Sequence, residues 1–175
     1  MINSLLLFIP FALQMFCMVV DEIYFHWERG LPRWERVGHP LDTLTVLACY
    51  VWLLAVPPSA FSLRIYIGLS VFSCLFVTKD ALVHSTHCRP YEHWLHAILL
   101  SVHPLVLLSA GLLWPVWHQQ TLSFIRYHGF ERKFLLGITL LTLAFGIYQL
   151  IYWNFICPSP ISQKQAKSTM TSTIN

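Results

Sequence analysis

The sequence predicts an all-α integral membrane protein with about five transmembrane helices. Of its 175 residues, 56% are hydrophobic and only 11% are charged, and the mean hydropathy is +0.58. The hydrophobic content, the charged content and the mean hydropathy all lie outside the range of ordinary soluble domains. Five long apolar runs divide the chain, and they cover residues 2–20, 43–57, 65–78, 94–117 and 134–156.

The first run is expected to remain as a transmembrane helix, because no Lys or Arg precedes it and no small-residue cleavage pattern follows Val20. The second and third runs are shorter than the roughly 17 to 25 residues that a span needs. They reach that length if their helices extend into the flanking polar residues, which makes Asp42 and Asp80 helical. Pro40 suits the first turn of the second helix.

The fourth and fifth runs are long enough to span without extension. We therefore expect one transmembrane helical domain over residues 1–157. The remaining segment, residues 158–175, is rich in Ser, Thr, Gln and Lys and has no apolar periodicity. It is predicted to be a disordered C-terminal tail.

The distribution of basic residues predicts an orientation with the N-terminus outside and the C-terminus in the cytoplasm. Cytoplasmic loops of membrane proteins are enriched in Lys and Arg. In this orientation seven basic residues are cytoplasmic and four are outside: Arg29, Arg33, Arg36, Lys79, Arg89, Lys164 and Lys167 against Arg64, Arg126, Arg132 and Lys133.

Histidines and carboxylates recur where the first four apolar runs meet polar sequence, all on the predicted cytoplasmic side. Ionisable residues at this depth are costly unless they are paired or used, and imidazole and carboxylate are the usual ligands of iron and zinc. We expect the first four helices to form a bundle with a metal site at one end. The candidate ligands are Glu22, His26, His39, Asp42, Asp80, His84, His87, Glu92, His93 and His96.

Helical spacing supports this hypothesis. Asp80, His84 and His87 fall within roughly 60° of one another around a helix, and Glu22 and His26 are four residues apart. Asp21 lies at a membrane depth similar to that of these residues. Such a number of ligands suits two ions better than one, as in carboxylate-bridged four-helix proteins, although their Glu-x-x-His spacing is absent here.

His103 lies about 10 Å deeper than His96 on the same helix and precedes Pro104. Proline frees a carbonyl group and can kink a helix. The sequence leaves three roles open for His103: a ligand, a proton relay, or a partner for the freed carbonyl.

Other chemistry-bearing residues are expected to be structural. Cys17, Cys49 and Cys74 lie within apolar runs, where free cysteine behaves as a small hydrophobic residue; Cys88 follows His87 and is more often a bystander than a thiolate ligand. His118 and His128 fall on the outer side and are expected to have no share in the site. Several aromatic residues are interpreted as lipid-facing or packing groups: Tyr50, Trp52, Tyr148, Tyr152 and Trp153.

A metal-dependent membrane enzyme is the favoured function. Paired iron would make it an oxidoreductase or hydroxylase, and zinc would make it a hydrolase, acting on a lipid-like or quinone substrate that enters from the bilayer. A haem-binding electron carrier is a weaker alternative, because only His103 lies deep within a span. A cation or proton transporter, or an ion-pair network of purely structural function, is also left open.

The absence of known binding motifs limits the classes of partner that we expect for this protein. It contains no phosphate-binding loop and no glycine-rich dinucleotide fingerprint, so nucleotides are not expected. The net charge of +3 is too small to indicate nucleic acid. Membrane lipid is the expected partner, together with a lipid-soluble substrate, and a homo-oligomer is compatible with the sequence.

Overall fold

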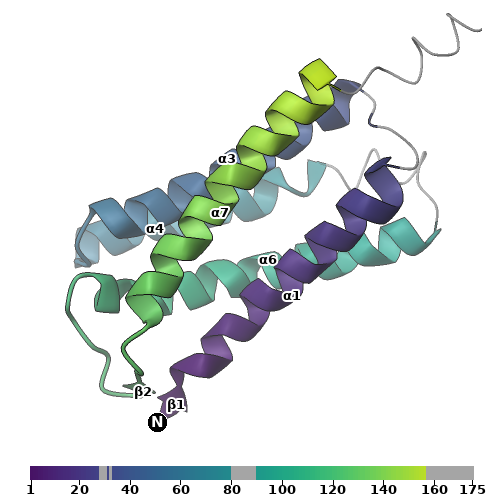
Figure 1. The fold of residues 1–175 in the computed structure, drawn as a ribbon. Coiled ribbons are helices and arrows are strands. Elements are labelled where there is room, and N and C mark those ends of the chain that lie inside the picture. The colour runs from purple at the N-terminus through teal and green to yellow at the C-terminus, as the bar shows by residue number, and fades with distance from the viewer. Residues whose placement is uncertain (28–30, 32, 80–89, 157–175) are drawn as a thin grey trace, which may run out of the picture.

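In the computed structural model of the protein, which describes residues 1–27, 31, 33–79 and 90–156, five long helices follow one another along the chain (Figure 1). They are α1 (Ile9–Val20), α3 (Arg33–Ala55), α4 (Ala60–Phe76), α6 (Pro90–Trp117) and α7 (Glu131–Ile151). The all-α prediction with five helices is confirmed. The predicted tail, residues 158–175, lies outside the described residues.

Short elements extend these helices at both ends. A 3-10 helix, η1 (Ser4–Phe8), leads into α1, and π-helices η2 (Asp21–His26) and η3 (Tyr152–Ile156) continue α1 and α7. Near the N-terminus, β1 (Ile2–Asn3) pairs in parallel with β2 (Ile125–Arg126). This two-stranded sheet lies at the end of the bundle where the N-terminus is marked (Figure 1).

Four of the helical segments within the described residues are long and apolar enough to cross a membrane. They are Ser4–His26, Trp34–Ala55, Tyr91–Trp117 and Glu131–Ile156. The fifth, α4, has 17 residues, or roughly 25 Å, which is at the lower limit for a span. The prediction of a multi-pass membrane protein therefore rests on four long spans and one shorter apolar helix.

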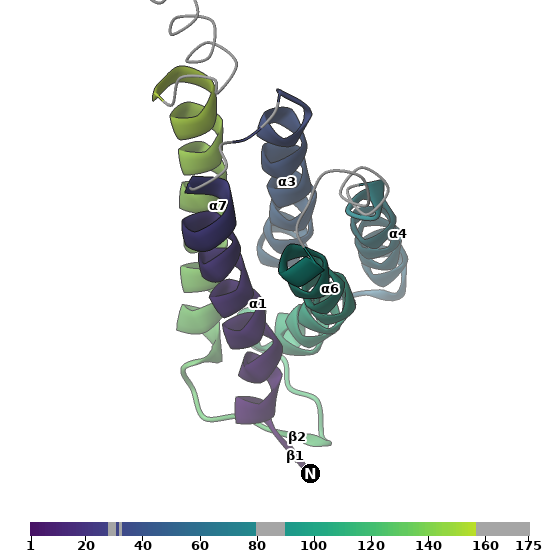
Figure 2. The ribbon, with the colours of Figure 1, turned by 90° about the vertical axis from the view of Figure 1, so that its right-hand side faces the viewer.

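The arrangement of the helices differs from the expected bundle of the first four. α1 packs on α6, and α7 packs closely on α3, whereas α4 lies on the outer side of α3 and α6 (Figure 2). Polar contact and a small residue bring α7 to α3: Thr43 Oγ1 donates to Gln149 Oε1 (2.7 Å), and the Thr43 side chain lies against Gly146. Small residues permit such close helix approach, so α7 takes the place expected of α4.

Side chains from the C-terminal end of α6 form hydrogen bonds with the last carbonyl groups of α3. Pro57 and Pro58 follow this helix and prevent its continuation, leaving its last carbonyl groups without helical partners. Trp114 Nε1 donates to Val56 O and Trp117 Nε1 donates to Leu54 O, each at 2.8 Å. His118 Nε2 lies 2.9 Å from Leu53 O, which gives this histidine a structural role.

Gly111 on α6 is required for the packing of α4. A Cβ atom there would lie 2.9 Å from Tyr66 Cε1, and the Tyr66 hydroxyl donates to Leu107 O (2.5 Å), which fixes the ring. We expect Gly111→Ala to lower the free energy of unfolding by about 1–3 kcal/mol through overpacking. Thermal unfolding in detergent measures the effect.

Gly68→Ala on α4 is the matched control, because no described heavy atom lies within 4 Å of the added Cβ. Alanine is the better helix former, so this variant should unfold at the same temperature as the wild type or above it. Equal unfolding temperatures for the two variants would contradict the packing described here.

Candidate metal centre

The centre is built on η2, where the last turn of α1 widens into a π-helix. In a regular α-helix Asp21 and His26 would point about 140° apart. The i→i+5 pattern of a π-helix brings them to the same side, and such wide turns often mark functional sites. His26 Nε2 lies 3.2 Å from Asp21 Oδ2, and His26 Nδ1 lies 3.0 Å from Glu22 Oε2.

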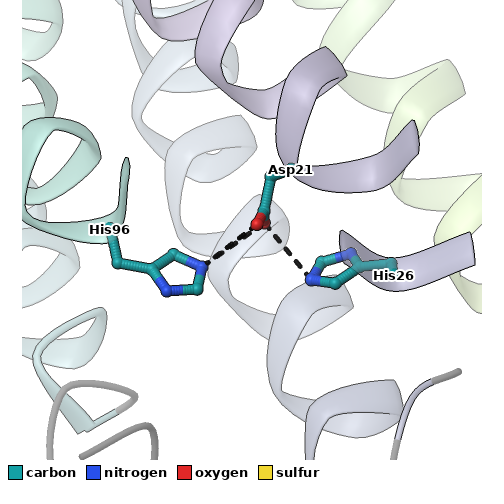
Figure 3. A group of neighbouring side chains, drawn as sticks. All are labelled: Asp21, His26 and His96. Atoms are coloured by element: carbon teal, nitrogen blue, oxygen red, sulfur yellow. Dashed lines mark hydrogen bonds and ion pairs between the residues drawn. The ribbon is translucent and has the colours of Figure 1, made fainter. Parts of the chain in front are cut away.

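A third candidate ligand, His96, comes from α6. Its Nε2 atom lies 3.4 Å from both oxygens of Asp21, so that the carboxylate stands between two imidazole rings (Figure 3). One ligand atom from each of Asp21, His26 and His96 lies within 4.8 Å of the others. Two histidines and one carboxylate form the ligand set of many catalytic zinc and non-haem iron sites.

His26 also belongs to a second group of ligands, formed with Glu35 and His39 from the first turns of α3. Their ligand atoms likewise lie within 4.8 Å of one another. The rings of His26 and His39 are 4.9 Å apart between centroids, and Glu35 is fully buried. The structure therefore gathers four further side chains of metal-ligating types around His26.

Glu22 orients His26 through a network that reaches α7. Glu22 Oε1 accepts hydrogen bonds from Tyr148 Oη (2.6 Å) and from Trp153 Nε1 (2.8 Å), while Oε2 faces His26 Nδ1. A carboxylate behind a histidine fixes the tautomer and aims the other ring nitrogen at a metal. Tyr148 and Trp153 were expected to be lipid-facing or packing groups, and the structure gives each of them a hydrogen bond to Glu22 in addition to ring contacts.

Two atoms of the centre, one on His26 and one on Asp21, lack a hydrogen-bond partner among the described residues. His26 Nε2 and Asp21 Oδ1 are buried and make no hydrogen bond with any described residue. With the proton of neutral His26 on Nδ1, toward Glu22, the lone pair of Nε2 faces Asp21 Oδ2. Two buried acceptors at this distance repel each other unless a proton or a cation lies between them.

A cavity of about 440 Å³ opens beside these ligands. Asp21, His26 and His96 lie at its polar end, and most of its wall is apolar, with residues from α1, α3, α6 and α7. Its volume falls within the range of pockets that enclose one small molecule, about 300–1,000 Å³. A ligand bound in the cavity would meet the candidate metal centre directly.

Three further sequence-predicted residues line this cavity without joining either ligand group of the described chain. They are Asp42, His93 and His103. Lys79 Nζ donates to Asp42 Oδ1 (2.5 Å), which gives that carboxylate a counter-ion. His103 Nε2 lies 3.0 Å from Ser73 Oγ on α4, so this histidine is held by a neighbouring helix.

The other predicted ligands are placed elsewhere or not described. Glu92 is buried in the first turn of α6 but, within the described part of the chain, belongs to neither group. Asp80, His84, His87 and the neighbouring Cys88 lie outside the described residues. The structure thus brings together His26, His39 and His96 from the predicted set, with Glu22 behind them.

Sequence reasoning did not select Asp21 or Glu35 as ligands. A signal for Glu35 was present, because Glu35 and His39 are four residues apart, as are Glu22 and His26, and Glu92 and His96. No comparable signal pointed to Asp21, whose approach to His26 depends on the π-helix.

The described residues thus form a multi-pass membrane protein with a candidate metal-binding group of histidines and carboxylates. The geometry of this group is the basis for interpretation, since no protein-family model, no curated protein and no solved structure matches the chain.

Proposed function

We propose that this protein is a membrane metalloenzyme in which Asp21, His26 and His96 bind one transition-metal ion. The observation that carries the proposal is the close approach of three ligating side chains: His26 Nε2 lies 3.2 Å from Asp21 Oδ2, His96 Nε2 lies 3.4 Å from the same carboxylate, and His26 Nδ1 is already engaged by Glu22. A cation bound by His26 Nε2 and Asp21 Oδ1 would give a partner to both of these buried atoms, which make no hydrogen bond with a described residue. Iron and zinc both suit this ligand set.

One ion is favoured over the two suggested by the number of ligands. His26 is shared by both ligand groups, and only its Nε2 atom remains for a metal. It can therefore serve one group at a time. Glu35 and His39 then stand beside the ion, where a carboxylate and an imidazole can accept or deliver a proton.

The cavity supports catalysis rather than a structural role for the ion. Structural sites close the coordination shell with four protein ligands, whereas catalytic sites keep positions open for water or substrate. Here three ligands face a largely apolar cavity between candidate membrane spans, which suits a lipid-soluble substrate. Bound iron would direct the enzyme to oxidation and bound zinc to hydrolysis. The excess of Lys and Arg on the same side favours a cytoplasmic location for this centre.

Elemental analysis by mass spectrometry tests the proposal. Wild-type protein purified in detergent without chelator is expected to contain about one equivalent of iron or zinc. His96→Ala removes a ligand and should lower metal affinity by more than about 100-fold, beyond the loss typical of outer-shell changes. His39→Ala should retain most of the metal, because His39 belongs to the second group.

His128→Ala is the control, since His128 lies at the other end of the chain's first span, 3.1 Å from Ser4. If His39→Ala lost the metal and His96→Ala kept it, the ion would be assigned to the group of His26, Glu35 and His39 instead. Wild-type protein that stays metal-free after incubation with iron(II) or zinc would overturn the proposal and leave an ion-pair network in which His26 is doubly protonated.

A further inference from the structure

The helices α1 and α7 are joined at two levels and leave part of the cavity wall between them. At the end near the N-terminus, the Phe8 and Phe11 rings lie 4.2 and 5.0 Å from the Phe134 ring between centroids. At the other end, Tyr148 and Trp153 donate to Glu22. From Phe11 to Glu22, α1 rises roughly 16 Å.

Between these two levels the cavity is lined by apolar side chains that are also exposed on the outside of the bundle. Met15 and Val19 on α1 are 42% and 48% exposed, and Leu141 on α7 is 48% exposed, yet all three line the cavity. Both helices belong to candidate membrane spans. Met15, Val19 and Leu141 therefore belong both to the cavity wall and to the apolar outer surface of candidate spans.

The cavity carries its charged and ligating side chains beside Asp21, and the rest of its wall is mostly apolar, with polar exceptions such as Gln14, His103 and Thr142. Toward the centre of the bundle its wall is formed by side chains such as Phe11, Tyr50, Val106 and Ile138. A molecule that fits has a polar group beside Asp21, His26 and His96 and a hydrocarbon chain extending away from them. At about 440 Å³ the cavity suits one such chain, and a two-chain phospholipid would leave a chain in the bilayer.

We infer that the substrate is a single-chain lipid with an oxygen-containing head group, and that it enters from the bilayer between α1 and α7. This inference rests on the proposed function, because the head group is placed at the metal centre. Fatty alcohols, aldehydes and acids belong to this class. The contacts of Phe134 at one level and the hydrogen bonds to Glu22 at the other fix the spacing of the two helices.

Photolabelling with a diazirine- and alkyne-tagged palmitic acid tests the inference on the full chain in phosphatidylcholine vesicles. Labelling of cavity residues should be saturable and should fall when excess untagged palmitic acid competes. Met15→Trp and Leu141→Trp fill the gap and are expected to reduce saturable labelling about tenfold, the effect of an overpacking cost near 1.4 kcal/mol. Phe16→Trp and Leu143→Trp are matched controls, since both residues are exposed and neither lines the cavity.

Metal content measured on the same samples separates the two proposals. Wild-type protein that holds metal but shows no saturable labelling of cavity residues would overturn the lipid inference and leave the metal centre standing. Saturable labelling that all four tryptophan variants share with the wild type would overturn the path between α1 and α7. Saturable labelling in metal-free wild-type protein, reduced by Met15→Trp, would support the lipid site and count against the metal.

Discussion

Replacing His26 with alanine is expected to abolish metal binding. His26 is the one residue common to both ligand groups among the described residues, so its loss removes a ligand wherever the ion lies. Metal affinity should fall by well over about 100-fold, more than the loss of an outer-shell partner, and activity should fall with it. Elemental analysis after incubation with iron(II) or zinc measures the loss, and thermal unfolding reports whether the protein remains folded.

A matched control and a chemical rescue strengthen this experiment. His103→Ala removes a buried histidine that lines the same cavity but, among the described residues, belongs to neither ligand group, so its metal content should match the wild type. Imidazole added to His26→Ala should enter the space left by the side chain and restore part of the metal. Equal metal loss in both alanine variants, without rescue, would indicate damage to folding rather than loss of a ligand.

Replacing Glu22 with glutamine is expected to weaken metal binding by about 10- to 100-fold, the usual effect of an outer-shell carboxylate. The amide keeps the shape of the side chain but loses the charge that holds the proton on His26 Nδ1. Tyr148→Phe should produce a smaller loss, because it removes one of the hydrogen bonds that fix Glu22. Metal titration in detergent, read by competition with a chromophoric chelator, measures both affinities.

Tyr152→Phe is the matched control for Tyr148→Phe. The two rings stack with centroids 5.3 Å apart, and within the described chain the hydroxyl donors to Glu22 include Tyr148 and not Tyr152. The control should bind metal as the wild type does. If Tyr152→Phe and Tyr148→Phe weakened binding equally, the effect would come from packing of the aromatic residues and not from orientation of Glu22.

The fold class followed from composition. A chain that crosses hydrocarbon must hydrogen-bond all of its backbone N–H and C=O groups, and an α-helix does so within its own segment. The five apolar runs therefore predicted five helices. Their packing was not predictable in the same way, because lipid and neighbouring helices are equally apolar and the hydrophobic pattern does not distinguish them. The contact of Thr43 with Gln149 and Gly146 placed α7 at the cavity and α4 outside it.

Membership of the candidate ligand groups could be predicted in part from residue type and membrane depth. His26, His39 and His96 were selected because imidazoles at membrane helix ends are costly without a function or partner, and the structure brings all three together. Asp21 and Glu35 were not selected. Tyr148 and Trp153 were interpreted as packing groups, because an aromatic ring at the membrane interface gives no sign in sequence of which acceptor it meets.

By itself, the sequence determined that this protein is helical, that its helices suit a membrane, and that histidines and carboxylates gather at one end, because these properties depend on local composition and run length. Tertiary structure alone decided that a π-helix turns Asp21 toward His26, that α6 supplies His96, and that α7 supplies the donors to Glu22. These features join residues as far apart as Glu22 and Trp153, and their geometry follows from how the helices pack rather than from any local pattern.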